Sequence, residues 1–172
     1  MFYQVLAADD KTKSMLHLAD ARIGGMAYTL GGGEAAASEL IEGKTEPERF
    51  SITCNALGLI GVDEKARLQF FRAIAVVLNL GQLLFETLDG DTDRSQVENE
   101  AQLEKICQLS GCQPADLALG FTERTMTARG EIFKVQLKQG ELSHLRSKIT
   151  DSPANHAMKL TRAGNRTLPP AL

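Results

Sequence analysis

The stretch FFRAIAVVLNLGQLLF, residues 70–85, decides the fold class of this chain. Its first eleven residues complete a predicted helix from Glu64 to Leu80, with Asp63 as the N-terminal cap and Gly81 as the stop signal. Apolar residues occupy nearly every side of the second half of this helix, which is typical of a helix buried on most sides. We therefore expect a mainly α-helical fold in which this helix is a core element of something larger than two layers.

A second helix is predicted to begin just after Thr45, because residues 45–48 read Thr-Glu-Pro-Glu, the pattern of a capping box. It carries Ile52, Ala56 and Ile60 on one face, at helical spacing, and it ends at Gly61. Further helical segments are expected at residues 2–8, 11–18 and 100–110, and from Pro114 onward.

Strand signals are fewer. Apolar Phe133, Val135 and Leu137 alternate with polar residues, which predicts a half-buried strand and, with the turn at 128–131, one β-hairpin over residues 121–138. A short strand is expected at 82–86. The acidic segment 89–98 is expected to be a loop, and the glycine-rich segment 24–33 to be irregular.

Composition excludes several classes of protein. The chain has 172 residues, a net charge of −3 and ordinary fractions of hydrophobic and charged residues, so it fits one soluble domain with no electrostatic case for nucleic acid or an anionic membrane. No transmembrane run or signal peptide is recognisable. The three cysteines, Cys54, Cys107 and Cys112, fit buried thiols on helices better than a disulfide framework or a zinc site. The cytosol is the expected compartment.

Five blocks in one order resemble the myosin motor head. Phe2–Ala8 resembles its "FYQLLAG" helix, and the segment from Leu16 to Gly33 is similar to its "LHL … YLNQGG" loop. Three later blocks complete the resemblance: Phe50 to Gly61, similar to "F … AM..LG"; Ala73–Phe85, similar to "ILAAILHLGNIxF"; and Leu103 to Leu119, similar to "L..AA.LLGV....L...L". Asn79 and Gln82 depart from it, because the family usually has His and Asn there.

This resemblance implies the helical region between the two nucleotide switches, that is, a bundle-like subdomain of a P-loop motor head with one short hairpin. Residues 1–138 are expected to form this segment, and residues 139–172 a diverged, disordered tail. The complete head of the family binds ATP and Mg²⁺, binds actin and acts in the cytoplasm on the cytoskeleton. The remainder of the head is therefore a second expected partner.

The residues that handle nucleotide are missing from the sequence. Gly43-Lys44-Thr45 resembles the end of a phosphate loop. That loop requires a glycine five positions before Gly43, but Ser38 stands there, and two acidic residues lie between Ser38 and Gly43. Thr45 is also needed as a helix cap. Neither family switch is recognisable. We assign no catalytic, cofactor-binding or metal-binding residue, and we expect the isolated chain neither to bind ATP with Mg²⁺ at micromolar strength nor to hydrolyse it.

The predicted hairpin lies where myosin heads carry an actin-facing loop. The resemblance therefore points to five residues as a candidate contact: Arg124, Arg129, Gly130, Lys134 and Lys138. Phe133, Val135 and Leu137 would hold the opposite face against the body. The loop at 89–98 corresponds to a second actin-facing loop, but its acids argue against strong contact with an acidic filament. A non-catalytic helical interaction module, with actin as one candidate partner, is the alternative function.

Overall fold

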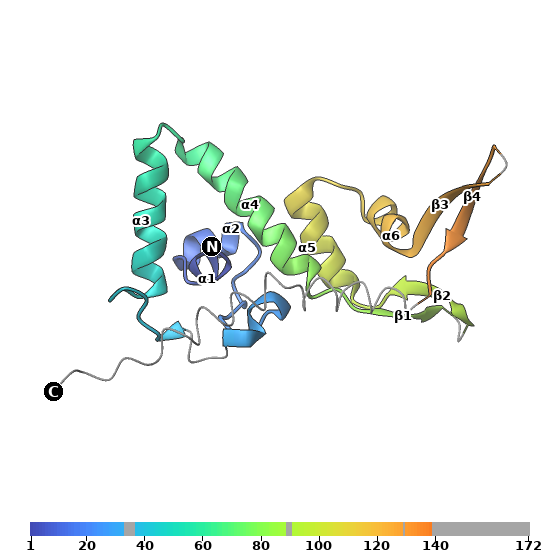
Figure 1. The fold of residues 1–172 in the computed structure, drawn as a ribbon, viewed down its shortest axis with the longest axis horizontal. Helices are drawn as coiled ribbons and strands as arrows, with labels where there is room; N and C mark the ends of the chain where they lie inside the picture. The colour runs from blue at the N-terminus through green and yellow to red at the C-terminus, as the bar shows by residue number, and fades with distance from the viewer. Residues whose placement is uncertain (33–36, 89–90, 129, 139–172) are drawn as a thin grey trace.

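The computed structural model describes residues 1–32, 37–88, 91–128 and 130–138 (Figure 1). The expected disordered tail, 139–172, lies outside these residues. The helices are α1 (Phe2–Leu6), α2 (Asp10–Met15), the 3₁₀ helix η1 (Ala27–Gly32), α3 (Glu46–Leu59), α4 (Glu64–Leu80), α5 (Glu100–Ser110) and α6 (Pro114–Thr122). The strands are β1 (Phe85–Leu88), β2 (Asp91–Val97), β3 (Glu123–Ala128) and β4 (Glu131–Gln136). The fold is mainly α-helical, with two small antiparallel sheets.

The predicted central helix is confirmed as α4. A carboxylate oxygen of Asp63 accepts a hydrogen bond from the backbone N–H of Ala66 at 2.7 Å, which satisfies one amide that the first helical turn leaves free. Leu78 is fully buried and Ile74 packs against the same core. Figure 1 shows α4 crossing the middle of the molecule, between α3 on one side and α5 on the other.

The capping box of α3 is also confirmed. The Thr45 hydroxyl accepts a hydrogen bond from the Glu48 backbone N–H, and the Glu48 carboxylate accepts one from the Thr45 backbone N–H at 2.7 Å. The bonds that the Glu48 carboxylate accepts from the backbone N–H and the hydroxyl of Thr45 lower the pKa of that carboxyl group, since they favour its charged form. Thr45 therefore fulfils the structural role that the sequence assigned to it.

Two hydrophobic clusters lie on either side of α4. The larger cluster joins α1, α3 and α4 to the loop that precedes η1, and the smaller one lies among Leu83, α5 and α6. Val76 of α4 contacts both clusters. Arg72, the one charged residue in the apolar stretch 70–78, donates to the carbonyl of Leu109 at 2.7 Å and so satisfies an open carbonyl at the end of α5.

The face of α3 that carries Ile52, Ala56 and Ile60 is exposed. Ile52 is 46% exposed and Ile60 is 76% exposed, whereas Phe50 is buried and its ring centroid lies 5.1 Å from that of Phe71. The helix packs through its other side because Phe50 is the larger apolar group. The second half of α4 is buried or partly buried on most sides, as expected, but one side is open to solvent, where Phe70 is 46% exposed.

The structure contains two hairpins where one was expected. Residues 91–97, expected to lie in a loop, form β2 and pair antiparallel with β1, and the register shifts between Thr87 and Leu88. The strand expected at 82–86 accordingly begins three residues later, at Phe85. The glycine-rich segment is not irregular throughout, because η1 forms within it.

The two departures from the family pattern hold the end of α4 in place. The Gln82 side-chain oxygen accepts from the backbone N–H of Ala27 at 3.1 Å, which fixes the start of η1. Gln102 of α5 donates to the side-chain oxygen of buried Asn79 at 2.7 Å. Because a buried amide needs partners, these bonds explain how two polar side chains are accommodated beside the core. Within the described ranges, no helix combines the length and apolar character that a bilayer span requires.

Candidate protein-interaction surface

The β3–β4 hairpin follows directly from the end of α6. Glu123, which ends that helix, has extended backbone angles, so the chain passes from helix to strand without a loop. Ala128 pairs with Glu131, which leaves two residues in the turn, and Gly130 takes a φ of +85° that glycine adopts without steric cost. The hairpin prediction is thus confirmed, with its first strand beginning two residues later than expected.

Strand pairing divides the predicted contact residues between the two faces of the hairpin. Arg124 pairs with Val135 and Met126 with Phe133, so these four side chains share one face. Lys134 pairs with Thr125 and lies on the other face. Arg129 and its side chain are outside the described residues. The structure therefore does not bring Arg124 and Lys134 together on one face.

The two predicted lysines have acidic neighbours. The amine nitrogen of Lys134 lies 3.6 Å from a carboxylate oxygen of Glu123, and that of Lys138 lies 2.6 Å from one of Asp93. Both lysine side chains and Asp93 are exposed, whereas Glu123 is partly buried, and the exposed Asp93–Lys138 pair contributes at most about 1 kcal/mol to stability. Arg124 is exposed and has no ion pair among the residues that the structure describes. Arg124 is thus the cation most open to a partner within the described hairpin.

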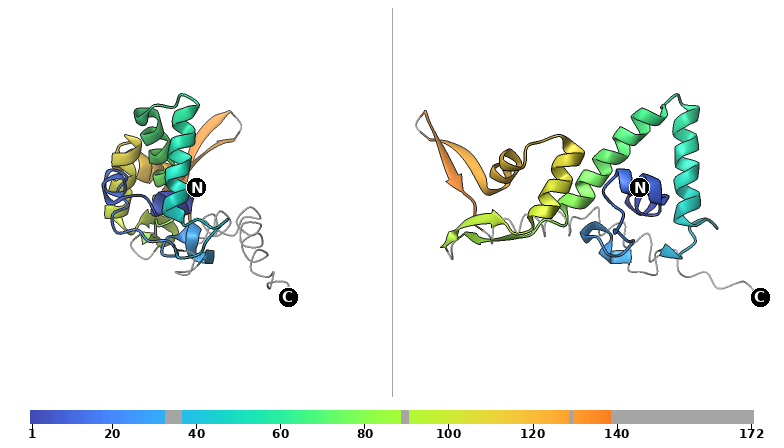
Figure 2. Two further views of the ribbon diagram at one scale, coloured as in Figure 1. Left: turned by 90° about the vertical axis from the view of Figure 1, so that its left-hand side faces the viewer. Right: turned by 180° about the vertical axis from the view of Figure 1, so that it is seen from behind.

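The expectation that Phe133 anchors the hairpin to the body was wrong, because this side chain is 47% exposed. Val135 and Leu137, nearer the base, are partly buried. The hairpin is held at its base and projects beyond it, as Figures 1 and 2 show. Its tip therefore presents apolar side chains beside its charges.

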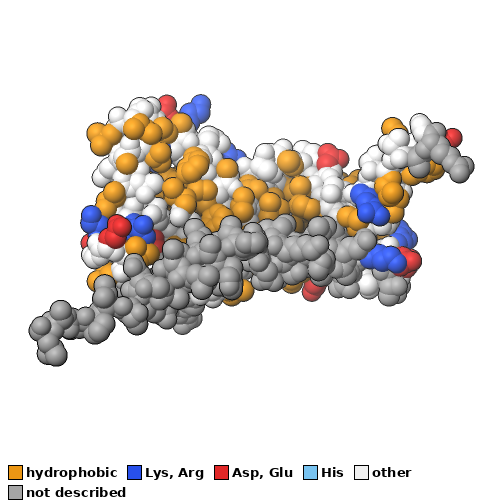
Figure 3. All heavy atoms as spheres, viewed as in Figure 1, with side chains coloured by type: hydrophobic (Ala, Val, Ile, Leu, Met, Phe, Trp, Pro, Cys, Tyr) orange, Lys and Arg blue, Asp and Glu red, His pale blue; other side chains and the backbone are white. Residues whose placement is uncertain are grey.

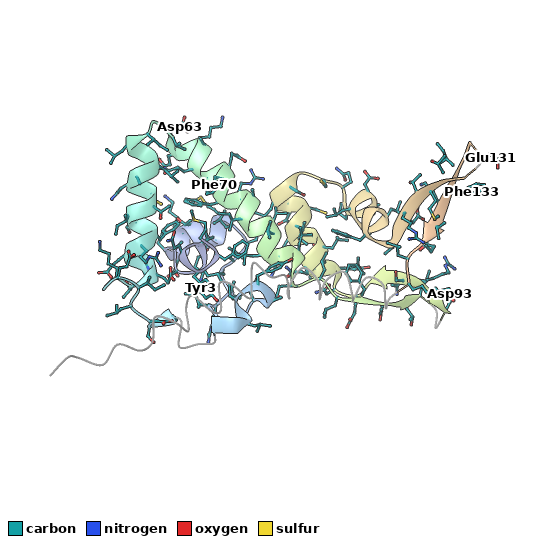
Figure 4. The ribbon with its side chains drawn as sticks, viewed as in Figure 1. Tyr3, Asp63, Phe70, Asp93, Glu131 and Phe133 are labelled. Atoms are coloured by element: carbon teal, nitrogen blue, oxygen red, sulfur yellow. The ribbon has the colours of Figure 1, made fainter. Side chains whose placement is uncertain are left out.

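The base of this hairpin is tied to the β1–β2 hairpin. Ser95 of β2 is buried, and its hydroxyl donates to the Leu137 carbonyl at 2.6 Å. The Asp93–Lys138 ion pair joins the same two segments. Figure 4 shows Asp93, Glu131 and Phe133 at one end of the molecule. The two elements expected to face a partner thus adjoin, although they are distant in sequence.

Sequence reasoning missed this juxtaposition. The only local sequence signal for the β1–β2 hairpin was the apolar and β-branched residues within 85–88, because Asp91 and Asp93 are poor strand formers. In the folded chain β2 contacts α6 and β4, which are distant from it in sequence. At the other candidate, Gly43-Lys44-Thr45, the Thr45 hydroxyl lies 2.8 Å from a Glu48 carboxylate oxygen, an arrangement that serves helix α3. No group of three metal-ligating side chains occurs in the described part of the chain.

The cysteines provide a test of the packing. Cys107 is buried and Cys54 partly buried, whereas Cys112 is exposed, which corrects the expectation that all three are buried on helices. Burial raises the pKa of the Cys107 thiol, and burial also raises that of Cys54 despite the nearby Arg67 guanidinium. A buried thiol ionises reluctantly and is therefore a poor nucleophile.

We expect Cys112 to be alkylated first and Cys107 last, as measured by mass spectrometry of native protein over a time course. Because the pKa of Cys107 is raised by folding, its contribution to stability is complete below the pKa of an unfolded thiol, about 8.5. That contribution is lost as the pH rises through the folded pKa. A Cys107→Ala variant should show a weaker alkaline loss of stability than the parent, and equal alkylation rates at all three thiols would contradict the packing.

Comparisons with known proteins agree on one family. The family model for the myosin head (motor domain) matches residues 1–152. The chain is 28% identical to Myosin-2B of Naumovozyma castellii over 132 residues, which is 76% of this chain and 9% of the relative. It is 29% identical to unconventional myosin-VI of Homo sapiens over 114 residues, 62% of this chain and 9% of the relative. A third relative, Myosin-2 of Saccharomyces cerevisiae, is 29% identical over 132 residues, 76% of this chain and 8% of the relative. The chain thus spans less than a tenth of the length of these relatives.

Proposed function

Because the chain belongs to the myosin head (motor domain) family, we propose that it acts as part of an ATP-driven motor on actin filaments and that its two-hairpin end faces the filament. ATP and Mg²⁺ binding are assigned to the complete head, because the sequence has neither a phosphate loop nor the switch motifs. The expected inactivity of the isolated chain stays a prediction. The proposed setting is the cytoskeleton in the cytoplasm.

The observation that carries the proposal is the hairpin end itself. The β3–β4 hairpin projects beyond the body, and one of its faces carries Met126 and Phe133 together with exposed Arg124, which lies nearer the base. An exposed cation attracts an acidic filament over several ångströms, and the apolar neighbours add contact area once the surfaces meet. The ion pair with Asp93 reduces what Lys138 can offer a partner.

The acidic β1–β2 hairpin sets a limit on this contact. Asp91, Asp93 and Glu98 are exposed beside a single cation, Arg94, and they would repel an acidic filament. Since attraction at one hairpin is opposed by repulsion at its neighbour, we propose a weak, salt-sensitive contact for the isolated chain. Tight binding would require surfaces from the rest of the head.

The test is co-sedimentation of the full chain with filamentous actin over a salt series. The Arg124→Glu, Lys134→Glu double variant should lower the apparent affinity about tenfold at low ionic strength, because it reverses two charges at the contact. The difference should shrink toward physiological salt, where the Debye length is about 8 Å.

A matched control reverses two exposed cations far from the hairpins, Lys11 of α2 and Lys65 of α4. The Lys11→Glu, Lys65→Glu variant has the same net charge as the hairpin variant and should pellet like the parent. Equal loss in both variants would show a non-specific charge effect. Unchanged pelleting of the hairpin variant at every salt concentration would show that actin is not bound through this hairpin.

A further inference from the structure

Two cysteines flank the turn at which α5 ends. Cys107 lies in the last turn of the helix, Cys112 lies just beyond its end, and Gly111 between them has a φ of +81°. The N–H of Gly111 donates to the carbonyl of Cys107 at 2.7 Å. A left-handed residue at this position turns the chain back over the last helical turn, so the residue that follows it comes close to the residue that accepts this bond. We call Cys107 and Cys112 the α5 thiol pair.

The electrostatics of the pair agree with this geometry. Burial raises the pKa of the Cys107 thiol, and the neighbouring Cys112 thiol and Glu104 carboxylate raise it further. Because the interaction between two charged groups weakens with distance, this influence places Cys112 close to Cys107. The third cysteine, Cys54, packs against the other hydrophobic cluster. Cys107 and Cys112 are therefore the two thiols best placed to react with each other.

The two thiols of the pair differ in their access to solvent. Cys112 is exposed, on the connection from α5 to α6 that Figure 1 shows at the edge of the molecule, whereas Cys107 is only 6% exposed. An exposed thiol meets a dissolved oxidant first, and a buried thiol is protected until the structure around it opens. Helix ends open locally at a much lower free energy than the whole fold. The pair thus offers one thiol for a first oxidation and a second thiol that becomes available when the last turn of α5 opens.

The last turn of α5 is held closed by a residue of α4. The Arg72 guanidinium donates to the carbonyl of Leu109 at 2.7 Å and to that of Gln108 at 3.3 Å. Cys107 itself packs within the smaller hydrophobic cluster. Figure 3 shows apolar side chains over the middle of the visible face, where α4 and α5 lie, so the bonds of Arg72 are a polar tie at a largely apolar joint. Opening the turn requires that these bonds break and that Cys107 leaves its cluster.

We propose that the α5 thiol pair is a peroxide-sensitive site that closes to a disulfide when the last turn of α5 opens. In the first step the Cys112 sulfur attacks an oxygen of hydrogen peroxide, the O–O bond breaks, and the thiol becomes a sulfenic acid as one water is released. In the second step the Cys107 sulfur attacks the sulfenic sulfur, an S–S bond forms, and the hydroxyl group leaves as water with the Cys107 proton. Hydrogen peroxide gains the two electrons that the two thiols lose.

The fold favours the reduced form of the pair. The packing of Cys107 and the bonds of Arg72 are both present when the turn is closed, so they stabilise the dithiol relative to the disulfide. Reduced glutathione should therefore reopen the disulfide, which is the behaviour of a transient, redox-sensing disulfide in a reducing compartment. This inference goes beyond the proposed function and does not depend on the actin contact, because neither of its tests contains actin.

The first test treats the full chain with hydrogen peroxide, blocks the remaining thiols with iodoacetamide and digests the product with trypsin. Cleavage after Lys105 and Arg124 leaves both thiols of the pair in one peptide, residues 106–124. Mass spectrometry should show that this peptide has lost two hydrogens and carries no alkyl group. Reduced glutathione, added before the block, should restore both thiols.

Two variants serve as controls for the first test. Cys54→Ser should form the disulfide as the parent does, and in Cys112→Ala, which changes an exposed side chain, Cys107 should remain a thiol. Any of three products would overturn the proposal: a peptide with Cys112 as a sulfinic or sulfonic acid and Cys107 as a thiol, a dimer linked through Cys112, or a disulfide that excess glutathione leaves intact.

The second test measures the rate of disulfide formation at one peroxide concentration. Arg72→Met removes the bonds that close the turn, so the disulfide should form about tenfold faster than in the parent. Arg67→Met is the matched control, because Arg67 lies on the same helix and its guanidinium donates at 2.7 Å to the carbonyl of Cys54 on α3 instead. Its rate should stay within about twofold of the parent rate. Equal acceleration in both variants, or in neither, would show that opening of the α5 turn does not control the reaction and would overturn the proposal.

Discussion

Replacing Leu78 by Ala should lower the free energy of unfolding by roughly 2–5 kcal/mol, because it removes buried methyl groups and leaves a cavity. Leu78 is fully buried within the larger hydrophobic cluster, on the helix that separates the two clusters. Urea denaturation followed by circular dichroism measures the change. This position therefore reports whether α4 is the centre of the core.

The adjacent residue provides the control. Val77 lies about 100° around α4 from Leu78, on an exposed side of the helix, so Val77→Ala should change the free energy of unfolding by no more than about 0.5 kcal/mol. Both variants shorten an apolar side chain on the same helix, and only burial distinguishes them. Equal losses in the two variants would contradict the orientation of α4.

The second large effect is expected at Gly81, the residue that ends α4. A Cβ atom built there would lie 2.5 Å from Cε2 and 2.8 Å from Cδ2 of the Tyr28 ring. The φ of Gly81 is −62°, which alanine adopts readily, so the substitution tests steric fit alone. We expect Gly81→Ala to cost about 1–3 kcal/mol of stability, since the ring must move from its place beside Phe2.

Replacing a second glycine by alanine should change the free energy of unfolding in the opposite direction. Gly58 lies within α3, and a Cβ there would come no closer than 3.7 Å to the Arg67 guanidinium, so Gly58→Ala should stabilise the chain by about 0.5–1 kcal/mol. Adding Tyr28→Ala to Gly81→Ala should remove the steric conflict, and a thermodynamic cycle then isolates it. Additive effects of the two substitutions would show that the ring and the glycine do not meet.

The helices could be predicted from the sequence because their signals are local. The carboxylate of Asp63 and the hydroxyl of Thr45 act within one helical turn, so residues three positions apart suffice to identify both caps. The turn at Gly130 could be predicted for the same reason, because its signal also lies within a few neighbouring residues. The side through which α3 packs could not be predicted, because Ile52 and Phe50 both offer apolar contacts, and only packing against Phe71 decides between them.

The surface at the hairpin end was less predictable. The sequence identifies Arg124, Lys134 and Lys138 as cations, but their surroundings depend on segments that meet only after folding. Asp93 is 45 positions from Lys138 and becomes its ion-pair partner because β2 docks beside β4. Strand alternation predicts which residues share a face, and it cannot predict which acidic neighbour neutralises a charge.

Val76 of α4 links the two hydrophobic clusters. This residue contacts the cluster that holds α1 and α3 and also the cluster that holds α5 and α6. If either cluster loses its packing, Val76 loses contacts on that side, and its packing against the other cluster is disturbed as well. The part of the molecule around α3 and the part around α5 and α6 are therefore expected to melt together in a single transition.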